Sequence, residues 1–252
     1  MSADAYLRSI LLREAVDTGL TLPVRSVIGA LRPAIVQWSG GYLADLSPSG
    51  SFAKGTANKS GTDIDIFVSL AHNTPETLKD IYTKLFQRMT ELGYKPKAQN
   101  VSINITVNGY DVDLVPAKRQ DFYSHDHSLY RRKADTWTKT NVATHINYIS
   151  QSGRVSEARL IKLWRNQKGL DFPSFYLELA VINALAGTYG TLAQNVLTVL
   201  RYLRDTFPAA RIIDPANTNN IISEDLTAAE KGKVKAAAER ALAAKTWGEI
   251  IA

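Results

Sequence analysis

The glycine-rich turn Gly50-Ser51-Phe52-Ala53-Lys54-Gly55-Thr56 is followed by the apolar run Asp63-Ile64-Asp65-Ile66-Phe67-Val68, which has the composition of a β-strand. Side chains two apart on a strand point to the same face, so Asp63 and Asp65 present neighbouring carboxylates while the isoleucines face the core. Their α-carbons are expected about 6.6 Å apart. At that spacing the carboxylates can converge on divalent ions ~3.5–4 Å apart, and a cation would relieve their mutual repulsion.

The turn contains the residue types of a phosphate-binding loop. Gly50 lets the backbone bend tightly and approach a ligand closely, and Ser51 offers both a hydroxyl and an amide to a phosphate. Lys54 and Thr56 add a charge and a hydroxyl nearby. The GxxxxGK[ST] string of the P-loop is absent, the strand with the acids follows the turn instead of preceding it, and we expect no helix directly after the turn.

A third carboxylate is expected from a neighbouring strand. The runs Val101–Val107 and Tyr110–Val115 read as two strands joined by Asn108-Gly109, which is a strong signal for a β-hairpin. Asp111 and Asp113 share one face of the second strand, so geometry alone leaves open which of them reaches the ions. We favour Asp113.

Each of these features is weak when taken singly, because a DxD pair can form a solvated face or a structural cation site and a Gly-Ser turn is common. Their order and spacing carry more weight. The strings GSFAKGT, TDIDIFV and VDLVPA together resemble the core of the polymerase-beta-type nucleotidyltransferases. That superfamily includes archaeal CCA-adding enzymes, oligoadenylate synthases, cyclic GMP-AMP synthase and the bacterial cyclic-oligonucleotide synthases, or CD-NTases.

Two later segments make the chain most like the CD-NTases. The helical run Leu160–Trp164 followed by Pro173–Leu179 is similar to the helix pair that holds the donor triphosphate and base in that superfamily. The segment Ile213–Ile221 resembles the DPANPTNNV-type element of the oligoadenylate and cyclic-oligonucleotide synthases. The resemblance extends from about Ser49 to Ile222 and so covers most of the chain.

The resemblance implies a metal site and a nucleotide site. Two Mg²⁺ ions, for which Mn²⁺ can substitute, would be held by Asp63, Asp65 and Asp113. The residues implied to contact the nucleotide are Gly50, Ser51, Lys54, Asn141, Lys162, Ser174, Phe175 and Tyr176.

Several of these nucleotide contacts have alternative readings. Lys162 lies at helical spacing among other polar residues, which is also typical of a salt-bridged surface helix. Phe175 or Tyr176 would stack on a base, although aromatic residues at such positions are more often part of a core. Asn141 falls where some related enzymes read a base edge, but a helix N-cap is its alternative role.

The fold class expected is α+β, with two lobes. A small mixed sheet with a spine helix forms the first lobe, and helices form the second. The catalytic lobe is expected over residues 1–125 and the helical lobe, which binds the donor nucleotide, over residues 126–252. The elements expected are helices at about 5–16, 23–38 and 75–92, strands at 43–46, 63–68, 101–107 and 110–115, a polar basic stretch over 118–140 and helices thereafter.

Composition agrees with these expectations. The 252 residues are 45% apolar and 21% charged, as in ordinary globular proteins, and the net charge of +6 favours an acidic ligand such as a nucleoside triphosphate or an RNA end. There is no cysteine, no leader-like N-terminus and no apolar run of eighteen residues, so we expect a cytoplasmic protein that does not enter the membrane. His125-Asp126-His127 reads as a loop, not a metal site.

The function implied is the joining of nucleoside triphosphates into a cyclic di- or oligonucleotide, with release of pyrophosphate. The product would be read by a separate effector in antiphage defence. One alternative is a template-independent RNA nucleotidyltransferase of the CCA-adding type, acting on a tRNA 3′ end. A third is a nucleotide-binding or RNA-binding module that has lost catalysis.

Overall fold

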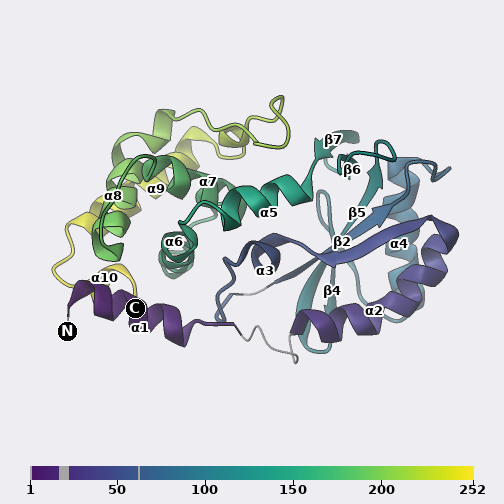
Figure 1. Ribbon diagram of the computed structural model, residues 1–252, viewed down its shortest axis with the longest axis horizontal. Helices are drawn as coiled ribbons and strands as arrows, with labels where there is room; N and C mark the ends of the chain where they lie inside the picture. Colours follow the sequence, from purple (N-terminus) through teal and green to yellow (C-terminus); the bar gives the residue numbers. More distant parts are fainter. Residues whose placement is uncertain (1, 17–22, 62) are drawn as a thin grey trace. The chain divides into compact units, whose positions relative to one another are not determined.

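The computed structural model describes residues 2–16, 23–61 and 63–252, so Thr62 of the TDIDIFV string and positions 1 and 17–22 of the first lobe lie outside the described residues. The chain folds into two compact units (Figure 1). The sheet unit contains the described residues of 17–54 and 61–146. The helical unit contains those of 1–16, 55–60 and 147–252.

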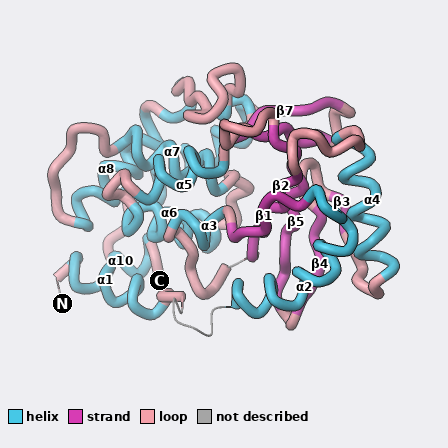
Figure 2. The backbone as a smooth tube through the Cα atoms, turned by 45° about the vertical axis from the view of Figure 1, so that its right-hand side comes forward, coloured by secondary structure: helices cyan, strands magenta, loops and turns pink. Residues whose placement is uncertain are grey.

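A mixed sheet of seven strands forms the centre of the sheet unit (Figure 2). Its order is β1-β2-β5-β4-β3, and β6 joins β5 to β7. The β2–β5 pair is parallel and the other pairs are antiparallel. The strands are β1 (Leu43–Pro48), β2 (Ile64–Leu70), β3 (Lys97–Ala98), β4 (Ile103–Val107), β5 (Tyr110–Arg119), β6 (His127–Arg131) and β7 (Thr136–Thr140).

The predicted hairpin is confirmed. Val107 pairs with Tyr110, and the two residues between them, Asn108 and Gly109, have φ angles of 52° and 83°. A two-residue turn with positive φ at both positions matches the twist of the flanking strands, and Asn-Gly is the pair that adopts it at least cost. The hairpin sets the register that carries Asp113 into the sheet.

One face of the sheet is covered by helices α2 (Pro23–Ser39) and α4 (Leu78–Glu91). The strand side chains Ile64 and Ile66 have no exposed surface and belong to a core that includes Leu31 of α2 and Leu85 of α4. The alternation predicted for β2 is therefore confirmed. Asp65, Phe67 and Ser69 consequently point to the opposite face.

The polar basic stretch over 118–140, for which no strand was expected, contains the end of β5 and two further strands, β6 and β7, and His127, expected in a loop, is the first residue of β6. Their sequences, His127–Arg131 and Thr136–Thr140, have few apolar residues, so local periodicity gives little sign of them. They form because the edge of β5 offers backbone partners: Ala117 pairs with Leu129 and Arg119 with His127. The sheet thus continues beyond residue 126.

The helical unit is built from α1 (Ala3–Arg13), α6 (Val155–Gln167), α7 (Ser174–Ala184), α8 (Leu192–Asp205), α9 (Ala228–Leu242) and α10 (Trp247–Ile250). Trp164, Tyr176 and Phe207 are fully buried in its core. Helix α5 (Val142–Ser150) begins in the sheet unit and ends in the helical unit. The division therefore differs from a single boundary near residue 125, because α1 packs with the helices and β6 and β7 with the sheet.

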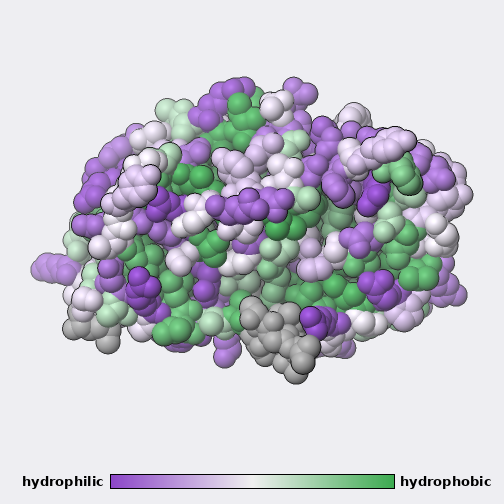
Figure 3. Space-filling model, in the orientation of Figure 1, coloured by the Kyte–Doolittle hydropathy of each residue, from purple (hydrophilic) through white to green (hydrophobic). Residues whose placement is uncertain are grey.

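The overall class, α+β with a mixed sheet and a helical part, is confirmed. On the face drawn in Figure 3, hydrophilic and hydrophobic residues are interspersed over both units. Among the described residues, every helix is too short or too polar to span a bilayer.

Candidate active site

The parallel pairing of β2 and β5 brings two predicted acids side by side. Asp65 is the direct partner of Asp113 in the register, on strands about 4.8 Å apart. Asp63 stands exposed just before β2. Burial raises the pKa of Asp113, the hydrogen bond from Asn104 lowers it, and the nearby charge of Asp63 raises it again. The three carboxylates therefore share one end of the β2–β5 pair.

The same register separates the two candidates for the third acid. Asp111 pairs with Thr106 of β4, lies just before the β5 residues that pair with β2, and is exposed. Asp113 is the direct partner of Asp65 and is partly buried. Placement thus favours Asp113, as the sequence interpretation did.

Asp113 is held by three polar side chains that sequence reasoning missed. Its Oδ1 accepts hydrogen bonds from Asn104 Nδ2 at 2.9 Å and from Gln99 Nε2 at 3.2 Å, and its Oδ2 lies 3.5 Å from Ser102 Oγ. The alternation of Asn104 with buried isoleucines on β4 could have indicated a polar position facing the acids. These contacts orient the carboxylate without neutralising it.

Gly50 is required by the position of Asp65. Its φ is +55°, a conformation that L side chains rarely adopt, and a β-carbon there would collide with the Asp65 carboxylate. The Ser49 amide donates to the Asp65 carbonyl at 2.8 Å, which ties the turn to β2. The turn and the acids are therefore one local structure.

The Gly50–Thr56 turn itself contains a short helix, α3 (Gly50–Lys54). Among the described residues no helix stands between this turn and β2, so the expectation of no helix directly after the turn is confirmed. Ser51, in the first turn of α3, is partly exposed, whereas Lys54 is only 6% exposed. Ser51 can therefore reach a ligand directly. The nucleotide contact of Lys54 stays a prediction.

The donor set suits Mg²⁺ or Mn²⁺, which take carboxylate oxygens as ligands. Like charge between Asp63 and Asp113 is a cost that a bound cation would relieve. Within residues 2–16, 23–61 and 63–252, no three acidic, histidine or cysteine side chains already stand together as a ligand group. An ion would have to draw the three acids together.

In the helical unit, Lys162 is part of a buried polar cluster. Its Nζ donates to the Thr56 carbonyl at 3.0 Å and lies 3.8 Å from the Glu178 carboxylate. The Thr56 hydroxyl donates to the same carboxylate at 2.5 Å. Lys162 and Glu178 are only 4% and 0% exposed. The triphosphate contact of Lys162 therefore stays a prediction, and its charge already balances that of Glu178.

Ser174 begins helix α7, and its Oγ accepts a hydrogen bond from Arg165 Nη1 at 2.9 Å. The next two residues differ in burial. Phe175 is partly buried, while Tyr176 is 0% exposed and lies 5.0 Å from Phe172, ring centre to ring centre. A ring without exposed surface has no face to offer a base, so the structure favours Phe175 over Tyr176 as the stacking candidate.

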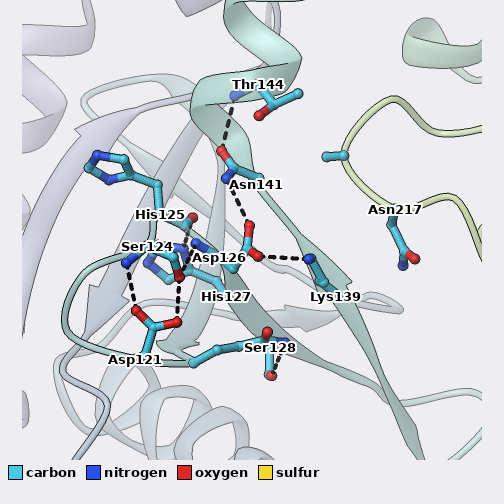
Figure 4. Close-up of polar contacts among 12 residues, drawn as sticks. Asp121, Ser124, His125, Asp126, His127, Ser128, Lys139, Asn141, Thr144 and Asn217 are labelled. Atoms are coloured by element: carbon cyan, nitrogen blue, oxygen red, sulfur yellow. Dashed lines mark hydrogen bonds and ion pairs between the residues drawn. The ribbon is translucent and has the colours of Figure 1, made fainter.

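Asn141 caps helix α5, which confirms its alternative role (Figure 4). Its Oδ1 accepts from the Thr144 amide at 3.0 Å, and its Nδ2 donates to Asp126 Oδ1 at 2.8 Å. Asp126 in turn forms an ion pair with Lys139 at 2.7 Å. Reading of a base edge by Asn141 stays a prediction, since both ends of its amide are engaged.

Comparisons with known proteins agree with this geometry. Residues 34–140 match the sequence family described as "Nucleotidyltransferase domain". The cyclic AMP-AMP-AMP synthase of Escherichia coli (strain MS 115-1) is 26% identical over 231 residues, with 72% of this chain and 72% of the relative covered.

Two solved structures share the fold. Escherichia coli MS115-1 CdnC with ATP has a TM-score of 0.78 at 20% identity, covering 99% of this chain and 97% of that one. The CD-NTase CdnG of Bradyrhizobium diazoefficiens in complex with GTP has a TM-score of 0.77 at 15% identity, covering 95% and 90%. The resemblance to the CD-NTases is thereby confirmed, and the alternative of a template-independent RNA nucleotidyltransferase of the CCA-adding type is not favoured.

Proposed function

We propose, from the premise that residues 34–140 are a nucleotidyltransferase domain, that this chain joins nucleoside triphosphates into a cyclic di- or oligonucleotide with release of pyrophosphate. The observation that carries the proposal is the pairing of Asp65 with Asp113 beside the Gly50–Ser51 turn. The relative from Escherichia coli, a cyclic AMP-AMP-AMP synthase, supports the cyclic product.

In the sheet unit, one group of residues would bind the triphosphate and another would bind the metal ions. Gly50 and Ser51 provide backbone amides and a hydroxyl for the triphosphate. Asp63, Asp65 and Asp113 would hold Mg²⁺ or Mn²⁺. When bound, such ions neutralise charge on the phosphates and lower the pKa of an attacking hydroxyl.

The proposed transfer has one bond forming and one breaking. A ribose hydroxyl of the acceptor nucleotide attacks the α-phosphorus of the donor, and the bond between the α-phosphorus and the oxygen that bridges to the β-phosphorus breaks. Asp113 accepts the hydroxyl proton, while Asn104 and Gln99 keep its carboxylate pointed at the reacting atoms. A second transfer within the linear product closes the ring.

The cellular part of the proposal rests on the family resemblance of the sequence. The enzyme acts in the cytoplasm, and a separate effector reads the cyclic nucleotide in antiphage defence. Among the proteins of similar fold, Escherichia coli MS115-1 CdnC forms a complex with HORMA-deltaN.

The decisive experiment compares Asp63→Asn/Asp65→Asn and Asp113→Asn with Asp111→Asn. Each protein is incubated with labelled triphosphates and Mg²⁺ or Mn²⁺, treated with phosphatase, and its products are identified by mass. We expect a phosphatase-resistant product from the wild type and a loss of more than about 100-fold in the first two variants, because each removes metal ligands.

Asp111→Asn is the matched control, since it makes the same change two residues away on the same strand. It should keep nearly full activity. Equal loss in Asp111→Asn and Asp113→Asn would overturn the assignment of the third acid. A wild type that extends labelled RNA and yields no small cyclic product would overturn the proposed function.

A further inference from the structure

A polar pocket lies on the face of the sheet that carries the acids. It is open to solvent, has a volume of about 150 Å³, and lies entirely in the sheet unit. Its floor comes from β1 and β2 and one wall from the first turns of α5. It is lined by Asp45, Ser47, Pro48, Phe67, Ser69, Arg119, His125, His127, Val142, Ala143 and Ile146.

Two hydrogen bonds at the base of the pocket indicate which nitrogen of His127 carries the proton, and the contact with His125 is drawn in Figure 4. Its Nδ1 is 2.8 Å from the His125 carbonyl, which can only accept, so Nδ1 carries the proton. Its Nε2 is 2.8 Å from Ser69 Oγ. Burial lowers the pKa of His127 and keeps the ring neutral, so Nε2 accepts the Ser69 proton. The lone pairs of Ser69 Oγ are then the acceptors that remain beside the pocket.

Arg119 supplies the opposite kind of group. It is paired with His127 across β5 and β6, and its charge is close enough to contribute to the lowered pKa of that ring. Its Nε atom is buried but has no hydrogen-bond acceptor among the described residues. The Arg119 side chain as a whole is partly exposed and lines the pocket, so its guanidinium can offer N–H donors to a ligand.

The pocket is therefore lined by hydrogen-bond donors, hydrogen-bond acceptors and apolar side chains. The donors come from Arg119, and the acceptors are Ser69 Oγ and the exposed carboxylate of Asp45, which is the partner of Ser69 in the β1–β2 register. Phe67 and the α5 side chains provide apolar walls. A cavity of this size accepts an aromatic ring, and this combination suits the flat, polar-edged ring of a nucleobase.

We propose that Arg119 makes this pocket selective for the guanine base of a nucleoside triphosphate. An arginine fork matches the O6 and N7 acceptors of guanine, whereas adenine presents an N6 amino donor where the second acceptor would be. The N1 and N2 protons of guanine then face acceptors of the kind that Ser69 and Asp45 supply. Pyrimidines lack the N7 acceptor altogether.

The pocket is placed to serve the transfer reaction, and this proposal rests on the proposed function. Phe67 and Ser69 follow Asp65 on the same face of β2 by two and four residues, which spans about 7–13 Å along the strand. A single nucleotide bridges that distance between its base and its ribose hydroxyl. The bound guanosine would therefore present its hydroxyl toward the acids.

The test compares Arg119→Met with Arg131→Met, which removes the same charge from an exposed position on β6. Equilibrium binding of GTP, 7-deaza-GTP and ATP is measured for both variants and for the wild type. In parallel, products formed from mixed ATP and GTP are identified by mass. We expect the wild type to prefer GTP over ATP by about 10- to 100-fold, the range of one bidentate arginine–guanine contact. Arg119→Met should remove this preference and Arg131→Met should retain it.

The binding and product measurements together distinguish failure of the guanine proposal from failure of the proposed function. A wild type that binds GTP and ATP equally, or an Arg119→Met variant with an unchanged preference, would overturn the guanine proposal even if a cyclic product forms. A GTP preference that depends on Arg119 without any product would support it and overturn the proposed function. If Arg119→Met does not fold, the wild type alone decides, because 7-deaza-GTP lacks N7 and should bind more weakly than GTP; equal binding of the two would contradict the proposal.

Discussion

At the scale of single residues, the candidate site depends on two contacts that fix the positions of its carboxylates. The Asp65 carboxylate occupies the space in which a β-carbon on residue 50 would lie. A hydrogen bond from the side-chain amide of Asn104 orients the carboxylate of Asp113. Neither contact is visible in the residue types of the turn and the DxD pair. Both contacts help to decide whether Asp65 and Asp113 point to a common ligand.

Gly50→Ala should abolish most activity, because the new methyl group displaces Asp65 in addition to straining a positive φ. Gly93→Ala is the matched control: Gly93 has a φ of +83°, but a β-carbon there meets nothing within 4 Å. Both variants should lose about 1–2 kcal/mol of unfolding free energy from the backbone strain. Activity assays and urea denaturation check this, and equal activities in the two variants would contradict it.

At the scale of elements, helices α6 and α7 are held together by charge as well as by apolar packing. Lys162 on α6 and Glu178 on α7 form a buried pair, and Thr56 contacts both, since its carbonyl accepts from Lys162 and its hydroxyl donates to Glu178. Removing one member of such a pair leaves the other charge buried, while replacing both with apolar residues of similar size is often tolerated. Single and double substitutions of this pair can therefore separate the contribution of Lys162 to protein stability from its predicted role in nucleotide binding.

Lys162→Met and Glu178→Leu should each lower the free energy of unfolding by about 3–5 kcal/mol, and the double variant should recover much of that loss. Stability is read from denaturation curves and nucleotide affinity from equilibrium titration. If the double variant is stable but binds triphosphate poorly, Lys162 contacts the phosphate as predicted. If it is stable and binds like the wild type, Lys162 is a structural residue only.

At the scale of the whole molecule, the chain assembles each unit from separated segments. The helical unit joins the first helix to the last: the Tyr6 hydroxyl donates to the Ile251 carbonyl at 3.0 Å. The stability of the helical unit therefore depends on contacts between residues far apart in the sequence. In the sheet unit, the protonation of a buried group such as His127 affects the folding equilibrium of the whole unit.

The unfolding free energy should fall as the pH is lowered below about 6.5, the ordinary pKa of histidine. Because the pKa of His127 is lowered in the folded state, the unfolded chain takes up a proton first, so stability is lost on acidification. The groups facing the ring are Ser69, Arg119, His125 and Asp126, with Asp45 across the pocket.

The expected slope is at most about 1.4 kcal/mol per pH unit. Urea denaturation at pH 7.5, 6.5 and 5.5 measures it, with His127→Gln as the comparison. That variant should lose this part of the pH dependence, and an identical slope in both proteins would show that His127 is not the group responsible.

Local patterns in the sequence predicted the parts of the fold that depend on neighbours along the chain. The alternation in Asp63–Val68 identified the buried and the acid-bearing faces of β2, and Asn108-Gly109 identified the hairpin, because strand period and turn conformation are local properties. The DxD pair was predicted for the same reason, whereas strand geometry alone left Asp111 and Asp113 as alternatives for the third acid. The family resemblance supplied the enzyme class.

Only the tertiary structure decided which residues from distant segments of the chain contact one another. The pairing of β5 with β6 turned a polar stretch into sheet, and the burial of Lys162 against Glu178 came from two helices and a loop more than a hundred residues away. The pocket of Ser69, His127 and Arg119 likewise draws on three strands. Such contacts are set by packing and by the pairing of backbone edges, and these depend on the whole fold and leave no period in the sequence.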